Sequence, residues 1–111
     1  MEHNIRGKHI FDNARVFEYA RVNWNAEVFD NARLYDNAQV SYNAKVFGNA
    51  QVSENAQVSG NAWVSGVAQV YEKALVTGYA RVAGNAHICG DAVIKGDCII
   101  TTGIITTGTY T

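Results

Sequence analysis

The side chains that could carry chemistry in this 111-residue chain are few, and several of them recur at every eighteenth position. The histidines are His3, His9 and His87, and His87 alone lies inside the regular part of the sequence. His87 and Cys89 fall on one outward face of the pattern described below, but zinc needs at least three protein ligands and no third is evident. His87 is therefore a candidate general base without an obvious orienting partner, and no metal site is predicted.

An arginine column offers different chemistry. Arg33 occupies the eighteenth position after Arg15, and Phe17 and Tyr35 follow these two arginines at the same offset. Guanidinium groups beside aromatic rings bind anions or nucleotides. The alternative is that the arginine stems lie over the rings and the charges pair with nearby carboxylates. Arg15, Arg33 and Tyr35 are thus candidate anion-binding residues, with a purely structural role as the alternative.

A column of carboxylates repeats at the same interval, and it consists of Glu18, Asp36, Glu54 and Glu72. Stacked carboxylates repel one another modestly in water. Calcium accepts several oxygen ligands and would be able to bridge them. A solvated turn explains the same spacing, and it is the interpretation that we favour.

These columns follow from a six-residue repeat, Asn-Ala-x-Val-x-x, which runs from residue 13 to residue 102 in fifteen consecutive units without an insertion. The aliphatic slot holds Val, Leu or Ile in every unit, and the small slot holds alanine fourteen times and then Cys98. The aliphatic residue lies between two variable ones, which is the out-in-out alternation of a three-residue strand. The next pair, usually Gly, Glu or Asp followed by Asn, indicates a turn, because Asn tolerates and Gly freely adopts the left-handed backbone conformation.

Residues three units apart resemble one another more than residues one unit apart do, so three units should make one three-sided coil. Residues one coil apart should then stack at about 4.8 Å, and five coils should form a triangular prism roughly 24 Å long. Val and Ala fill the interior, so we expect no internal pocket. Any site must lie on an outer face, at a corner or between chains.

At this point the chain resembles the hexapeptide-repeat, left-handed β-helix family over residues 13–102. The resemblance implies an all-β fold, a single-stranded left-handed parallel β-helix of triangular cross-section with about five coils, each made of three six-residue units. The left hand is taken from the resemblance, because the common crossover rule favours a right-handed coil; a right-handed β-helix of the bactofilin kind is the alternative. Residues 1–12 are expected to form an N-terminal cap and partial coil, and residues 103–111 a C-terminal strand or cap.

The resemblance also introduces two enzyme classes. The family includes acyl-CoA-dependent acyltransferases, which use a catalytic histidine, and γ-class carbonic anhydrases, which bind zinc through three histidines. Both are typically trimers with sites between subunits. Because His87 is the one histidine within the coils and no long loop interrupts them, no catalytic residue is carried over from the family.

The twelve aromatic residues are distributed unevenly, with eight of them before residue 50 and none in a core slot. Steps of three units place Trp24 over Tyr42 at one corner and Phe29 over Phe47 on the adjoining side, with Trp63 one coil further on. A contiguous apolar surface typically marks an interface. Ladders that only stiffen the strands and a ligand platform are the alternatives.

The amino-acid composition indicates which binding partners and which cellular compartment to expect. The formal net charge of −1 gives no general attraction to nucleic acid or to acidic membranes. No signal peptide and no apolar run long enough to span a membrane occurs, so we expect a cytoplasmic protein. The two cysteines, Cys89 in an outward slot and Cys98 in an inward one, predict no disulfide.

The register of the repeat changes to five residues near the C-terminus, where residues 99–103 and 104–108 both read Ile-Ile-Thr-Thr-Gly. These uncharged segments predict an exposed strand edge. Either the edge pairs with another chain, or the natural chain continues past Thr111.

We therefore hypothesise a non-catalytic solenoid that assembles with itself, as a trimer or dimer, or docks another protein, without a cofactor, nucleic acid or membrane. One alternative is an acyl-CoA-dependent acyltransferase-like protein, active or remnant, with His87 as its base. The other is a small anion- or nucleotide-binding protein that uses the Arg15 and Arg33 face.

Overall fold

Each six-residue unit folds as a short strand followed by a tight turn. The computed structural model describes residues 10–111, and its regular structure there consists of seventeen two-residue strands. Each of the first fifteen strands holds the aliphatic residue and the variable residue before it. The strands are one residue shorter than predicted because the third residue uses its carbonyl in the turn, as Phe17 O accepts the Ala20 N–H at 3.1 Å.

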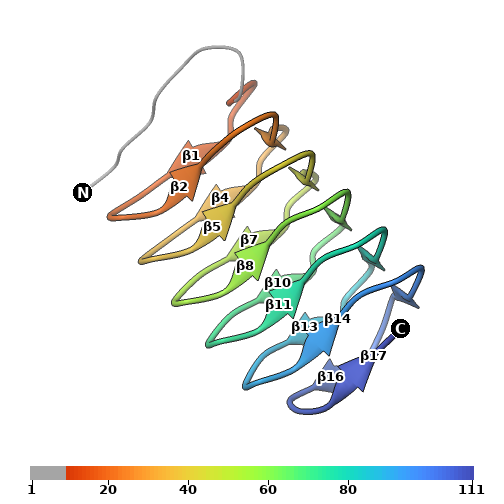
Figure 1. Cartoon of the computed structure of the whole chain (residues 1–111). Helices are drawn as coiled ribbons and strands as arrows, with labels where there is room; N and C mark the ends of the chain where they lie inside the picture. The colour runs from red at the N-terminus through yellow and green to blue at the C-terminus, as the bar shows by residue number, and fades with distance from the viewer. Residues whose placement is uncertain (1–9) are drawn as a thin grey trace.

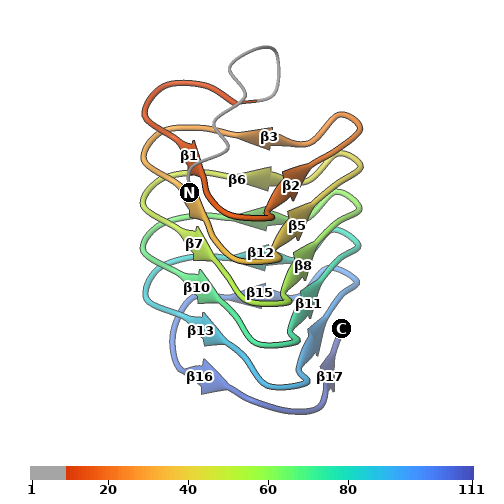
Figure 2. The same ribbon diagram turned by 90° about the vertical axis from the view of Figure 1, so that its left-hand side faces the viewer.

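The strands form three parallel sheets, one on each side of a triangular prism (Figures 1 and 2). Neighbouring strands come from consecutive coils, so residues three units apart lie side by side, as Arg33 and Gln51 do. The β1 sheet consists of β1 (Arg15–Val16), β4 (Arg33–Leu34), β7 (Gln51–Val52), β10 (Gln69–Val70), β13 (His87–Ile88) and β16 (Ile104–Ile105). The β2 sheet consists of β2 (Arg21–Val22), β5 (Gln39–Val40), β8 (Gln57–Val58), β11 (Leu75–Val76), β14 (Val93–Ile94) and β17 (Thr109–Tyr110). The β3 sheet consists of β3 (Glu27–Val28), β6 (Lys45–Val46), β9 (Trp63–Val64), β12 (Arg81–Val82) and β15 (Ile99–Ile100).

The coils wind in the left-handed sense. In Figure 2 the chain descends from the N-terminal coils at the top, crosses the near side from β1 to β2, left to right, and returns leftward behind through β3. Figure 1 agrees, because the corner between β1 and β2 lies at its left, the side that faces the viewer in Figure 2. A path that turns anticlockwise as it recedes from an observer at the top is left-handed, as the resemblance implied, although the crossover rule favours the opposite hand.

The turn between strands places one residue in the left-handed backbone conformation, and that residue precedes the asparagine. Asp30 and Gly48 have φ angles of 60° and 69°, whereas no asparagine of the described residues has a positive φ. The sequence pattern left both Gly and Asn as candidates for this conformation, and the structure gives it to the residue before Asn. The Ala N–H closes each turn on the carbonyl three residues earlier, as in Ala32 to Phe29 at 3.3 Å. A positive φ at the second turn residue alone is the type II′ pattern, which explains why the slot before Asn is often Gly.

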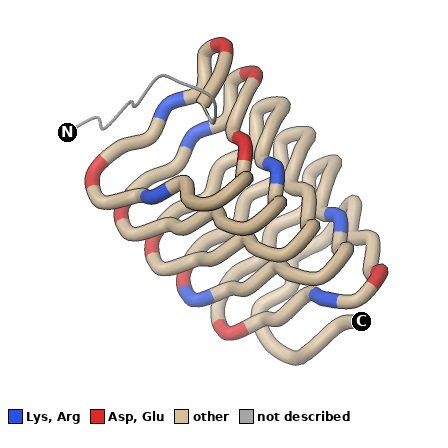
Figure 3. Tube along the Cα trace, turned by 45° about the horizontal axis from the view of Figure 1, so that its top comes forward, with Lys and Arg blue, Asp and Glu red and all other residues tan. Residues whose placement is uncertain are grey.

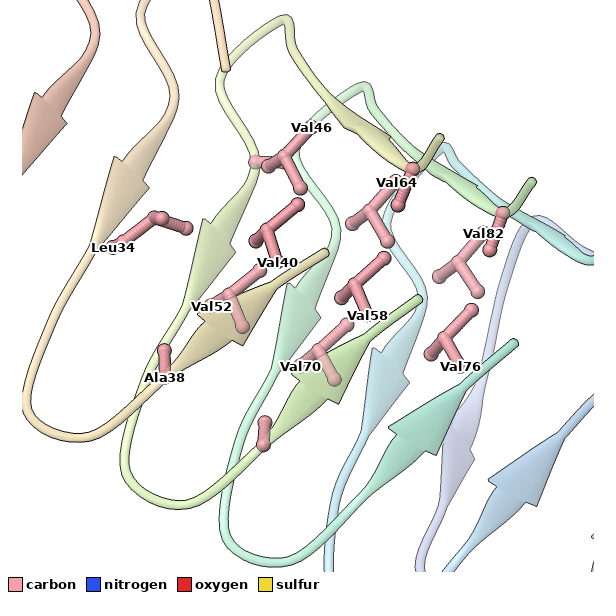
Figure 4. Packing of buried hydrophobic residues seen from close by; sticks show 14 of the residues in the cluster. Leu34, Ala38, Val40, Val46, Val52, Val58, Val64, Val70, Val76 and Val82 are labelled. Atoms are coloured by element: carbon pink, nitrogen blue, oxygen red, sulfur yellow. The ribbon is translucent and has the colours of Figure 1, made fainter. Parts of the chain in front are cut away.

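The interior of the prism is filled by the two inward slots of the repeat. Aliphatic residues from all three sheets meet along the axis (Figure 4), and side chains such as Val40, Val46 and Val52 have no exposed surface. Burying one such side chain contributes roughly 1.5–3 kcal/mol, and each coil repeats that contribution three times. No polar or charged side chain among residues 10–111 is buried. The chemistry of this part of the chain therefore lies on the outside of the coils.

The last coil is shorter than the others. β13 pairs with β16 in the register His87 to Ile104, and β14 pairs with β17 in the register Val93 to Thr109. Paired residues on β13 and β16 are therefore separated by one residue fewer along the chain than three full units, and those on β14 and β17 by two fewer. The change to five-residue units accounts for both differences. With this sixth, shorter coil the molecule measures 34 × 22 × 21 Å, longer than the roughly 24 Å expected for five coils.

The first coil begins at Ile10, which forms a parallel bridge with Val28. Most of the cap predicted for residues 1–12 lies outside the described residues, as do His3 and His9. Within residues 10–111, no helix has the length and apolar character needed to cross a membrane.

Candidate functional site

Three pairs of aromatic rings stack face to face on the first two coils. The three-unit register brings the two rings of each pair onto adjacent strands or adjacent turns, as the sequence spacing predicted for two of the pairs. The ring centroids lie 5.1 Å apart in Phe17–Tyr35, 5.9 Å in Trp24–Tyr42 and 4.9 Å in Phe29–Phe47, with interplanar angles of 5°, 3° and 1°.

Trp24 and Tyr42 stand at the corner between the β2 and β3 sheets, and they are the most exposed of these rings, at 69% and 55%. Their φ angles are 60° and 61°, in the left-handed region that bulky residues rarely adopt. The next two coils carry Gly60 and Gly78 at the same corner, so the turn itself needs no side chain there. The two aromatic residues cost roughly 1–2 kcal/mol each in backbone strain, at a slot that glycine or an acidic residue occupies in the other described six-residue turns.

The β3 sheet continues this surface with a column of charged and aromatic side chains. Lys45 Nζ lies 3.9 Å from Glu27 Oε1. The Trp63 ring is flanked by two cations, with its centroid 5.7 Å from Lys45 Nζ and 4.4 Å from the Arg81 guanidinium carbon. Its edge contact with the Phe47 ring spans 5.8 Å between centroids. The column therefore holds Trp63 half-buried between positive charges. We call the set Trp24, Phe29, Tyr42, Phe47 and Trp63 the aromatic surface.

A polar groove runs along the start of the β1 sheet, beside the corner that leads into it. Arg15 and Arg33 are exposed register partners on adjacent strands. No ion pair or cation–π contact engages either guanidinium within residues 10–111, in contrast to Lys45 and Arg81. Tyr35 stacks on Phe17 and does not line the groove. The lining side chains are Asn13, Arg15, Asn31, Arg33, Asn49 and Gln51.

The two facing arginines favour binding of a small anion in this groove, whereas nearby carboxylates disfavour it. Two like charges directly opposite on adjacent strands destabilise the pair, and an anion between them would relieve that repulsion. Asp12 and Asp30, however, lie at the adjoining corner beside Asn13 and Asn31. Their negative charges reduce the attraction that the two arginines exert on an anion.

The carboxylate column at the corner between the β1 and β2 sheets has a structural role that the spacing did not indicate. Glu54 Oε1 accepts the backbone N–H of Glu72 at 3.0 Å, and Glu72 Oε1 accepts that of Gly90 at 2.8 Å. Asp30 does the same at another corner, where it accepts the Gly48 N–H at 3.1 Å. Acidic residues recur at the corners of successive coils (Figure 3). These hydrogen bonds tie each coil to the next, and no group of three or more metal-binding side chains forms among residues 10–111.

His87 and Cys89 lie on the outer side of the β1 sheet, but they do not form an open pair. The His87 ring meets the Tyr71 ring edge-on, with centroids 6.3 Å apart. Cys89 is only 4% exposed although it occupies an outward slot. The neighbouring coils cover it, because its N–H bonds to Ile105 O at 2.9 Å and Tyr71 lies one coil earlier. A hydrogen bond with the Cys89 side chain, and then burial, raise the pKa of the Tyr71 hydroxyl.

No carboxylate among the described residues is hydrogen-bonded or ion-paired to His87. A general base of the acyltransferase kind needs a nearby acceptor pocket and an orienting partner. The aromatic edge of Tyr71 supplies neither. His87 thus remains a candidate base on its residue type alone.

The six-residue repeat, the three parallel sheets and the filled triangular interior define the class of protein: this chain is a three-sided parallel β-solenoid built from six-residue units. One family model, described as "YdcK Beta solenoid repeat", matches residues 56–72, which span β8, β9 and β10 and thus nearly one coil. No curated protein and no solved structure matches the chain.

Several residues at these surfaces escaped sequence reasoning. Asn13, Asn31 and Asn49 were assigned to turns, yet their side chains line the groove beside Arg33. Arg81 was not singled out, although it lies one coil after Trp63 and stacks over that ring. A comparison of residues three units apart would have identified the groove asparagines and Arg81, if it had included every polar residue and not the conspicuous types alone.

Proposed function

We propose that this chain is a non-catalytic solenoid module that assembles with further copies of itself through the aromatic surface. The observation that carries the proposal is the stacked pair Trp24 and Tyr42, which is exposed and held in a strained backbone next to Phe29 and Phe47. Exposed aromatic residues are the commonest anchors of protein interfaces. Docking of a different protein on the same surface is the alternative within this class.

The surroundings of the aromatic surface favour a copy of the same chain as the occupant. Glu27 lies at one end of the charged column on the β3 sheet, and Lys45 and Arg81 follow it. A surface that carries both signs of charge is able to complement itself in a symmetric oligomer. A reducing compartment such as the cytoplasm is the proposed location, and it is supported by the free thiols of Cys89 and Cys98.

Native mass spectrometry of the protein as purified tests the proposal. We expect a species whose mass is a small multiple of 12.1 kDa, without added mass. A single 12.1 kDa species at micromolar concentration would contradict self-assembly. Added mass of a phosphate-type anion would favour the Arg15 and Arg33 groove as the functional site instead, and added mass of an acyl-CoA would favour the transferase alternative.

A further inference from the structure

The β3 sheet and the corner that precedes it carry three columns of outward positions whose order along the solenoid axis is self-complementary. In two of the columns the first two coils hold aromatic residues and the next two hold small ones, and in the third column the first and last residues, Glu27 and Arg81, have opposite charges. The corner column reads Trp24, Tyr42, Gly60, Gly78; the first strand column reads Glu27, Lys45, Trp63, Arg81; the second strand column reads Phe29, Phe47, Ser65, Ala83.

We propose that two copies of the chain pair through this face with their solenoid axes antiparallel. The twofold axis that relates them lies in the plane of the interface and runs across the face between the coils of Lys45 and Trp63. The inference rests on the proposed function and specifies its geometry. A twofold axis that lies in the interface at right angles to the solenoid axis brings each column opposite the same column of the partner, in reverse order. The two copies have the same coil spacing, so all four rows meet in register.

Charge complementarity supports this register. Glu27 lies opposite the partner subunit's Arg81, and Arg81 lies opposite the partner subunit's Glu27. Between them, the Lys45 ammonium lies opposite the partner subunit's Trp63, a ring that already attracts two cations within one chain. The reversed column therefore pairs Glu27 and Arg81 with opposite charges and places no like charges directly opposite each other.

The sizes of the facing side chains match in the same register. Trp24 and Tyr42 lie opposite the partner subunit's Gly78 and Gly60, where the absence of side chains leaves room for the rings. Phe29 and Phe47 lie opposite the partner subunit's Ala83 and Ser65. A parallel arrangement would instead put large residues against large ones at one end and small against small at the other, with a gap there. The antiparallel pairing is the one that fills the face evenly.

The area of the face fits a dimer at the small end of the range of specific interfaces. The four facing rows span roughly 19 Å along the solenoid axis and 22 Å across it, so each copy contributes roughly 420 Å², about half of the roughly 800 Å² per partner of a standard interface. The pairing also covers Trp24, whose exposed fraction of 69% is unusual for tryptophan.

Charge reversal across the proposed contact provides the test. In one chain, three coils separate Glu27 from Arg81, about 14 Å, and substitutions farther apart than about 7–10 Å do not normally couple. Glu27→Arg and Arg81→Glu should each weaken dimerisation about tenfold or more, because each brings like charges together. The double variant restores opposite charges, and its dimer dissociation constant should return to within about threefold of the wild type in sedimentation velocity.

A matched control variant separates the proposed contact from a general effect of charge, and the oligomeric state of the wild type separates this geometry from self-assembly as such. Glu27→Arg combined with Arg21→Glu, which lies on the β2 sheet, makes the same changes of charge without the proposed contact and should give no recovery. Oligomers in the wild type without recovery in the double variant would overturn this geometry and leave the proposed function standing. A wild type that is monomeric at all concentrations would overturn both.

Discussion

At the residue scale, the slot of a residue in the six-residue unit decides whether its side chain faces the core, and its neighbours one coil away decide how far an outward side chain is covered. Val52 and Ser53 are adjacent, yet Val52 has no exposed surface and Ser53 is half-buried on the outer face. Cys89 occupies the same type of outward slot as Ser53 and is nevertheless covered. The alternation of inward and outward side chains could be predicted from the sequence of one unit, whereas the burial of Cys89 depends on residues of other coils.

The alternation gives a direct prediction about stability. Val52→Asp buries a carboxylate without a partner, which costs several kcal/mol and removes much of a total stability of about 5–15 kcal/mol. Ser53→Asp places the same group toward water and should cost less than about 1 kcal/mol. Thermal unfolding should therefore show a large loss of melting temperature for the first variant alone. Equal melting temperatures for the two variants would contradict the assignment of inward and outward slots.

At the element scale, the turn is the part of the repeat that the sequence described least well. Gly and Asn both favour turns, and composition alone did not show which of the two takes the positive φ. The structure assigns it to the residue before Asn, and it leaves the Asn side chains free to line a groove or, as Asn37 does with Asn55 at 3.4 Å, to bond along the corner. The carboxylate hydrogen bonds across coils escaped prediction because they join a side chain to a backbone group of the next coil.

Two glycines in equivalent turns separate backbone strain from crowding. Gly66 and Gly96 have φ angles of 67° and 66°, so alanine at either position costs the same roughly 1–2 kcal/mol of strain. A Cβ at Gly66 would lie 2.7 Å from the backbone nitrogen of Gly84, whereas one at Gly96 would meet its nearest neighbour, Thr111 Cβ, at 3.4 Å.

Gly66→Ala should therefore destabilise the protein by about 1–3 kcal/mol more than Gly96→Ala, because crowding adds to the strain. Chemical denaturation of the two variants side by side measures the difference. Equal free energies of unfolding would mean that neighbouring coils separate more easily than their close approach implies.

At the scale of the whole molecule, the repeat predicted the fold well because one signal specifies it fifteen times. The six-residue period predicted the strand and turn, and the three-unit period predicted the three sheets and their register. The surface was less predictable, because a column of outward residues has meaning only in relation to its neighbours. Trp63 was predicted to be an interface residue because it lies one coil beyond Phe47 on the same side, but the cations on either side of it became visible only in the structure.

The uneven distribution of side chains along the axis bears most on function. Aromatic stacks crowd the first two coils, and the later coils hold Gly60, Ser65 and Gly78 at the corresponding positions. If the rings served only to stiffen exposed strands, every coil would benefit equally from them. The restriction of the face-to-face stacks to the first two coils, with one stack at the positive-φ positions Trp24 and Tyr42, fits a surface that recognises a partner.

The double variant Trp24→Gly, Tyr42→Gly tests this central claim most directly. Glycine relieves strain of roughly 1–2 kcal/mol at each position, against losses of about 0.4–1 kcal/mol each from unfolded-state entropy and about 0.5–1.5 kcal/mol from the ring stack. These terms nearly cancel, so the variant should unfold at nearly the wild-type temperature. Its mass by light scattering should fall to that of a 12.1 kDa monomer. A variant that keeps the oligomeric mass of the wild type would contradict assembly through the aromatic surface.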